Sequence, residues 1–249
     1  MMGIVLWAAP EKGRRTVELS VMNAAGVRFV CAQVVRGPRT PEALVRRRVS
    51  AAGRRLAGRG VKQAVLPPDF PYMDRLARWG VAPVSTLALR RRLAAEWMRC
   101  ALEEQGVSSA SARVAVCAAA VTGEVVRTVT ELALRRRYVL LSMPGGEALA
   151  RQLRREYGVA LLLDPSAEQL EAAEGLVLFD PRPDLTCGNP AVVPLYREDL
   201  PLPEILLPPA LEAQLPRGAD RGALLAALYQ AGAVKAGEMS LSRASRLTF

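Results

Sequence analysis

The feature that most constrains the fold is a regular alternation of strand-like and helix-like segments between residues 113 and 180. Short apolar runs typical of buried strands are separated by segments whose apolar residues recur at helical spacing. The expected strands are 114–117, 138–141, 159–163 and 176–179, and the expected helices are 122–137, 147–157 and 167–173. Strands joined through helices run parallel, because each crossover returns the chain to the same edge in the same direction. The sequence therefore predicts an open parallel sheet.

The turn after the first of these strands has the spacing of a nucleotide-binding turn. In such sheets a dinucleotide binds where the first strand leads into its helix, at three glycines spaced G-x-G-x-x-G. Ala118, Ala120 and Gly123 stand at the three positions. This layout resembles the Rossmann NAD(P)-binding domains, and the apolar helix expected ahead of it, at 85–104, is similar to the layout of shikimate-dehydrogenase-like enzymes. The resemblance implies a Rossmann-like fold with an NAD(P) site at this turn.

The implied site departs from the family pattern at three contact points. Ala118 replaces the glycine that allows the tight turn, and the methyl group of Ala120 is expected to intrude where the backbone approaches the pyrophosphate. Ser142 stands at the end of the second strand, where the family has an acidic residue for the ribose. We therefore expect a scaffold that binds no dinucleotide, with NAD(P) binding through an atypical turn as the alternative.

Asp180 is the strongest functional candidate in this half of the chain. It follows the fourth expected strand, at the carboxyl edge of the sheet where ligands of open parallel sheets bind. An aspartate followed by Pro181 is also a common turn-capping residue, so a purely structural role is the alternative.

The composition excludes several kinds of chemistry. The 249 residues include no histidine, which removes the commonest general base, the commonest zinc ligand and every imidazole-dependent nucleophile. The four cysteines have no paired spacing, so we expect no metal and a reduced, cytoplasmic protein. No uncharged apolar run approaches the roughly 20 residues of a membrane helix, so we expect no membrane partner. No residue is assigned as catalytic.

Residues 1–105 are expected to form a separate, mixed α/β unit. Two alternating segments within 16–35 are joined by a turn ending in Gly26, which is typical of a hairpin. A helix is expected to begin at Pro41, with Val45, Val49, Ala52 and Leu56 on its buried face. The helix at 85–104 is apolar over a wide arc, so we interpret it as the bridge to the next domain. A serine-rich linker at 106–112 would then lead into a Rossmann-like domain at 106–249 that ends in a proline-rich extension.

The positive charge is concentrated in the first half. Residues 1–112 hold 19 Lys and Arg against 8 Asp and Glu, giving +11, and the remaining residues give −1 of the net +10. Four arginines lie away from the buried face of the helix that begins near Pro41 and provide a candidate surface for nucleic acid: Arg46, Arg47, Arg54 and Arg55. The alternative is a solvated helix face that reflects the arginine-rich composition of a bacterial, GC-rich genome.

The sequence thus predicts an α/β protein in which a mixed N-terminal unit is joined by a long helix to a Rossmann-like parallel sheet. The leading hypothesis for function is a non-catalytic scaffold that binds a small molecule or a protein partner. An NAD(P)-dependent oxidoreductase and a nucleic-acid-binding protein are the alternatives.

Overall fold

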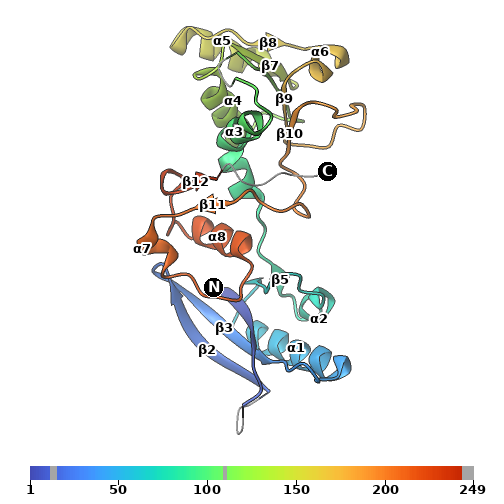
Figure 1. Ribbon diagram of the computed structural model, residues 1–249, viewed down its shortest axis with the longest axis vertical. Helices are drawn as coiled ribbons and strands as arrows, with labels where there is room; N and C mark the ends of the chain where they lie inside the picture. The colour runs from blue at the N-terminus through green and yellow to red at the C-terminus, as the bar shows by residue number, and fades with distance from the viewer. Residues whose placement is uncertain (12–15, 109–110, 243–249) are drawn as a thin grey trace. The chain divides into compact units, whose positions relative to one another are not determined.

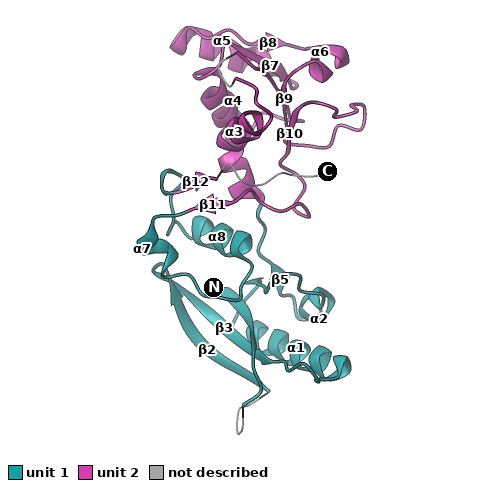
Figure 2. Cartoon of the chain, in the orientation of Figure 1, with its two compact units in different colours: residues 1–86, 207–238 teal, residues 87–206, 239–249 magenta. Residues whose placement is uncertain are grey.

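The computed structural model describes residues 1–11, 16–108 and 111–242. The chain forms two compact units, shown separately in Figure 2. Unit 1 comprises residues 1–86 and 207–238, and unit 2 comprises residues 87–206 together with the segment from 239 onward. None of the described helices is long and apolar enough to cross a bilayer.

Unit 1 is built on a five-stranded sheet with the order β2-β3-β1-β4-β5. Its strands are β1 (Met2–Ala8), β2 (Val17–Ala24), β3 (Val27–Val35), β4 (Gln63–Val65) and β5 (Ala82–Pro83). Strand β2 pairs with β3 in the antiparallel direction as the expected hairpin, whereas the other pairings are parallel. The helices are α1 (Glu42–Ala57), α2 (Met73–Ala77), α7 (Pro209–Glu212) and α8 (Arg221–Gln230), with a short 3-10 helix, η1 (Ala236–Glu238).

Helix α1 packs on β2 and β3, and α2 packs against α1 (Figure 1). The expected apolar face of α1 is confirmed, because Val45, Val49, Ala52 and Leu56 are all buried in one core cluster. Because this face holds α1 on the sheet, the opposite face of the helix is left toward solvent.

Unit 2 contains the parallel sheet that the alternation of segments predicts. Its strands are β6 (Arg113–Cys117), β7 (Tyr138–Ser142), β8 (Leu162–Leu163), β9 (Gly175–Leu178) and β10 (Ala191–Pro194). They pair in the order β10-β9-β6-β7-β8, and every pairing is parallel. In chain order this is the 3-2-1-4-5 arrangement of doubly wound nucleotide-binding sheets. The fold of unit 2 is Rossmann-like.

Helices complete the layers of unit 2 (Figure 1). They are α3 (Leu87–Glu104), α4 (Gly123–Ala133), α5 (Gly146–Tyr157) and α6 (Ala167–Glu171). Helix α3 packs against α4, β9 and β10, whereas Leu170 of α6 lies in a separate core cluster with Ala115 and Leu176. A two-stranded antiparallel pair, β11 (Ile205–Leu206) with β12 (Ser240–Leu241), belongs to the same unit.

The division into units differs from the expected domain boundary between 105 and 106. Helix α3, interpreted from the sequence as a bridge, belongs to unit 2, because its wide apolar arc packs on α4 and the parallel sheet. The segment 106–112, expected to be a linker, also lies inside unit 2, and its residues 109–110 are outside the described part of the chain.

Only the first part of the proline-rich extension, up to residue 206, stays with the Rossmann-like domain. Residues 207–238 return to unit 1, where the backbone N–H of Asp220 donates to the carbonyl of Leu66 at 2.7 Å. Helix α8 of this segment contacts β4, and Leu224, Leu225 and Leu228 on it are buried.

Candidate functional site

The carboxyl edge of the unit 2 sheet brings the expected site residues into one region. Ala118 follows β6, Ser142 ends β7, and Asp180 lies just beyond β9, and these three strands are neighbours. The turn after β6 is fixed on both sides, because the N–H of Ala118 donates to the carbonyl of Ser142 at 3.2 Å and the N–H of Phe179 donates to that of Cys117 at 2.9 Å. This is the switch point of the strand order, where doubly wound sheets bind their ligands.

The carboxylate of Asp180 occupies the turn that would hold a diphosphate. Its Oδ2 accepts a hydrogen bond from the backbone N–H of Ala119 at 2.7 Å. Amides of this turn bind phosphate oxygens in dinucleotide-binding proteins. A phosphate oxygen placed about 4 Å from the carboxylate would be opposed by about 4 kcal/mol per pair of unit charges at an effective dielectric constant of 20. A phosphate at this turn would therefore compete with the Asp180 carboxylate for the Ala119 amide.

The three fingerprint positions do not form a glycine-type turn. Neither Ala118 nor Ala120 adopts a positive φ, and the Ala120 side chain is exposed. Helix α4 begins only at Gly123, after Thr122, whose Oγ1 accepts from the N–H of Val125 at 3.3 Å. A Cβ atom placed on Gly123 would meet no atom of the described chain within 4 Å. Gly123 thus lacks the close helix–strand packing that the third glycine of the fingerprint provides.

Ser142 contacts an arginine that the sequence analysis did not single out. Nη1 of Arg182 donates to Oγ of Ser142 at 3.0 Å, and the same guanidinium binds both carboxylate oxygens of Asp184 at 2.8 and 2.6 Å. The ion pair lowers the pKa of Asp184 to about 2, mainly through the hydrogen bonds from Arg182. Burial raises the pKa of the Cys117 thiol, at the end of β6, to about 11. Arg182 lies two residues after Asp180, and this position in the sequence was the signal that could have marked it as a residue of the site.

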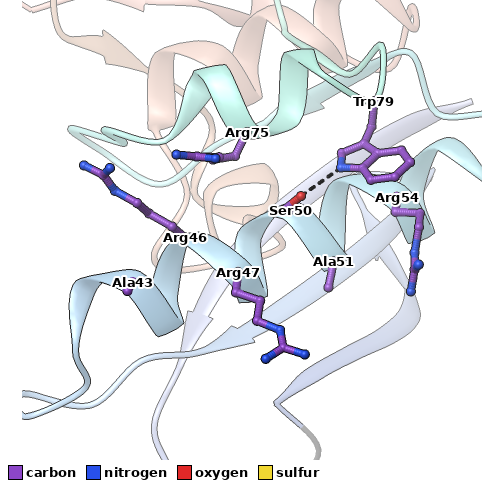
Figure 3. Close-up of a pocket in the computed structure, with 8 residues that line it drawn as sticks. All are labelled: Ala43, Arg46, Arg47, Ser50, Ala51, Arg54, Arg75 and Trp79. Atoms are coloured by element: carbon purple, nitrogen blue, oxygen red, sulfur yellow. Dashed lines mark hydrogen bonds between the residues drawn. The ribbon is translucent and has the colours of Figure 1, made fainter.

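A second candidate site lies entirely within unit 1, on the exposed side of α1. It is a groove of about 550 Å³, which we call the arginine groove (Figure 3). Its lining residues are Ala43, Arg46, Arg47, Ser50, Ala51, Arg54, Arg75 and Trp79. In Figure 3, Arg46 of α1 and Arg75 of α2 extend toward the same end of the groove, while Arg47 and Arg54 extend from α1 on its other side.

Three of the four arginines expected to form one basic surface line this groove, and the fourth does not. Arg55 is turned toward the sheet, where its Nη1 donates to the carbonyl of Val17 at 2.6 Å. Arg48 likewise donates to the carbonyl of Val35 at 2.6 Å. These two arginines therefore hold α1 to the strands, since each supplies a charged donor to a backbone oxygen. Arg55 is therefore not one of the cations that line the groove, although it is exposed.

The groove also depends on residues 75 and 79, which sequence reasoning missed. Nε1 of Trp79 donates to Oγ of Ser50 at 3.0 Å, which fixes the indole over α1. This approach requires glycine at position 53, because a Cβ atom there would lie 2.9 Å from Cδ1 of Trp79 and 3.2 Å from Cδ2 of Leu76. A glycine inside an otherwise helical pattern indicates a close approach of this kind. Arg75 had no comparable sequence signal.

Metal chemistry has no support in the described residues. They contain no group of three or more cysteine, aspartate or glutamate side chains that could hold a metal ion, and the sequence has no histidine.

No protein-family profile matches the chain, and no curated protein matches it by sequence. Among solved structures it is similar to L-tryptophan dehydrogenase from Nostoc punctiforme, with 14% identity over 67% of this chain and 51% of that one at a TM-score of 0.31. A dipicolinate synthase chain from Bacillus halodurans gives 18% identity over 48% of this chain and 43% of that one at a TM-score of 0.31. Shikimate 5-dehydrogenase from Listeria monocytogenes gives 10% identity over 60% and 58% at a TM-score of 0.26.

The chain thus spans about half the length of the first two of these proteins. At these identities and TM-scores the likenesses carry no activity over to this protein. The assignment of unit 2 as Rossmann-like depends on its parallel pairings and strand order.

Proposed function

We propose that this protein is a non-catalytic binding protein for a small molecule or a protein partner, with a Rossmann-like unit that binds no dinucleotide at its first turn. The observation that carries the proposal is the 2.7 Å hydrogen bond from the Ala119 amide to the Asp180 carboxylate. The chain's own anion lies where a diphosphate would bind. The absence of histidine from the sequence supports a non-catalytic role.

Calorimetric titration of the full chain with NAD+, NADH and NADP+ tests this proposal. We expect no binding up to 1 mM of each nucleotide, since an opposing term of about 4 kcal/mol corresponds to roughly a thousandfold loss of affinity. Binding of any of the three at micromolar concentration would contradict the proposal.

An NAD(P)-dependent oxidoreductase remains a second candidate, favoured by the strand order and by one contact. Arg182 donates to Ser142 at the end of β7, where an arginine accommodates the 2′-phosphate of NADP in Rossmann domains. This candidate requires Arg182 to exchange Asp184 for the nucleotide. It therefore predicts micromolar binding of NADP+ that Arg182→Gln weakens at least tenfold, with little change for NAD+.

A further inference from the structure

The charge around the arginine groove is only half balanced. Two of its four arginines have an acidic neighbour, with Arg46 at 2.6 Å from Glu42 and Nε of Arg75 at 3.1 Å from Asp74. Arg47 and Arg54 form no ion pair with any described residue, and no acidic residue lines the groove. The groove therefore carries an excess of about two positive charges.

The shape of the groove suits a compact ligand. Ala43, Ser50 and Ala51 place small side chains between the arginines, and the Trp79 indole borders one end. Its volume of about 550 Å³ lies within the usual range of small-molecule sites, about 300–1,000 Å³. Arg48 and Arg55 donate to backbone carbonyls, so the cations that line the groove are Arg46, Arg47 and Arg54 of α1 and Arg75 of α2.

We infer that the arginine groove binds a small molecule through a dianionic phosphate monoester. Such a group carries about −1.5 to −2 charges at pH 7, which matches the excess charge, and its oxygens fit the planar fork of a guanidinium. The inference rests on the proposed function in one respect: it names the ligand class that the binding protein takes. It does not use the turn of unit 2.

Protonation of the ligand gives the site a defined pH dependence. A phosphate monoester loses its second charge as the pH falls through about 6, so its affinity should fall about tenfold between pH 7.5 and 5. The ionisable groups beside the groove are Glu42, Asp74 and the arginines at 46, 47, 54 and 75. Sulfate stays dianionic throughout, so it should bind with nearly constant affinity over the same interval.

The experiment measures glycerol 2-phosphate binding to the full chain by calorimetry and by the change in tryptophan fluorescence, since Trp79 is one of the three tryptophans and borders the groove. The groove variant is R47Q/R54Q, and we expect it to weaken binding at pH 7.5 at least tenfold. The matched control is R151Q/R154Q on α5, which also removes two positive charges from exposed arginines. Arg154 lies in the last turn of α5, as Arg54 does in α1. We expect the control to change affinity less than twofold. Circular dichroism verifies that both variants are folded.

Several results would overturn the inference. They are an affinity equally reduced in both variants, an affinity unchanged in the groove variant, no binding by the wild-type chain at 10 mM, or an equal pH dependence for sulfate and glycerol 2-phosphate. Binding of an unphosphorylated dT12 oligonucleotide is measured in the same way. If dT12 binds more tightly than glycerol 2-phosphate and R47Q/R54Q abolishes its binding, the groove takes a polynucleotide instead. Micromolar NAD(P) binding that is unchanged in R47Q/R54Q would overturn the proposed function, but it would not bear on the phosphate site inferred for the groove.

Discussion

The docking of α3 on the parallel sheet of unit 2 requires glycine at position 175. A Cβ atom there would lie 2.5 Å from Sδ of Met98, and 3.2 Å from both Cε of Met98 and Cγ2 of Val114. Non-bonded carbon atoms are in optimal contact at about 3.5–4.0 Å, so α3 or the Met98 side chain would have to move by about 1 Å. Met98 and Val114 are both 0% exposed, which leaves no solvent-filled space for that movement.

We therefore expect Gly175→Ala to lower the free energy of unfolding by about 1–3 kcal/mol, the usual cost of overpacking a core. The sign is informative, because replacing glycine by alanine inside a strand is otherwise stabilising by roughly 0.5–1 kcal/mol. Urea unfolding followed by circular dichroism and tryptophan fluorescence measures the change. Gly123→Ala is the control, since its methyl group meets nothing within 4 Å and should not destabilise the protein.

A double variant separates the proposed clash from a backbone effect. Met98→Ala alone should cost about 2–5 kcal/mol as a buried cavity. Adding Gly175→Ala to it should cost little, because the sulfur atom that the new methyl group would meet is gone. The coupling energy should therefore exceed about 1 kcal/mol. Strictly additive effects, or a Gly175→Ala protein as stable as the wild type, would refute this account of α3 docking.

Three further predictions concern unit 2. Asn189→Ala should lower the free energy of unfolding by about 2 kcal/mol in urea titrations, because Nδ2 contacts three carbonyl oxygens at the end of α6, at 2.8, 3.2 and 2.9 Å; an unchanged midpoint would exclude this capping role. The Asp184 carboxyl should titrate at about 2 by NMR, and Arg182→Gln should return its pKa toward 3.8. Because the folded pKa is lowered, the stability that the pair contributes is present above about pH 4 and is lost as the pH falls through 2. Cys187, which is partly exposed, should react with a thiol reagent well before the buried Cys117, whose pKa of about 11 keeps it protonated; equal rates would contradict the burial of Cys117.

The predicted parallel sheet is confirmed because it depends on local periodicity. Each apolar run between 113 and 180 forms a strand of one sheet, and β10 adds a further strand to it. The boundaries are less accurate where tertiary contacts end an element. Helix α4 stops at Ala133, short of the expected 137, and β8 covers only Leu162–Leu163 of the expected 159–163. Pairing with a neighbouring strand determines where a strand ends, and the sequence does not specify that neighbour.

The candidate sites were only partly predictable. The spacing of Ala118, Ala120 and Gly123 located the turn, but the bond between Asp180 and Ala119 joins residues 61 positions apart. Arg54 and Arg55 are adjacent in the sequence, yet one lines the arginine groove and the other binds the carbonyl of Val17. No local pattern separates such neighbours, because the partner of each side chain lies on a distant segment.

The sequence by itself determined the α/β class, the parallel sheet, the apolar face of α1 and the exclusion of histidine chemistry. These follow from composition and from the periods of helices and strands, which are local properties of the chain. Only the tertiary structure decided that α3 packs on the second sheet, that residues 207–238 return to unit 1, and that the four groove arginines come from two helices. The physical reason is that burial and hydrogen bonding choose among many surfaces of similar hydrophobicity, and only the folded chain shows which surfaces meet.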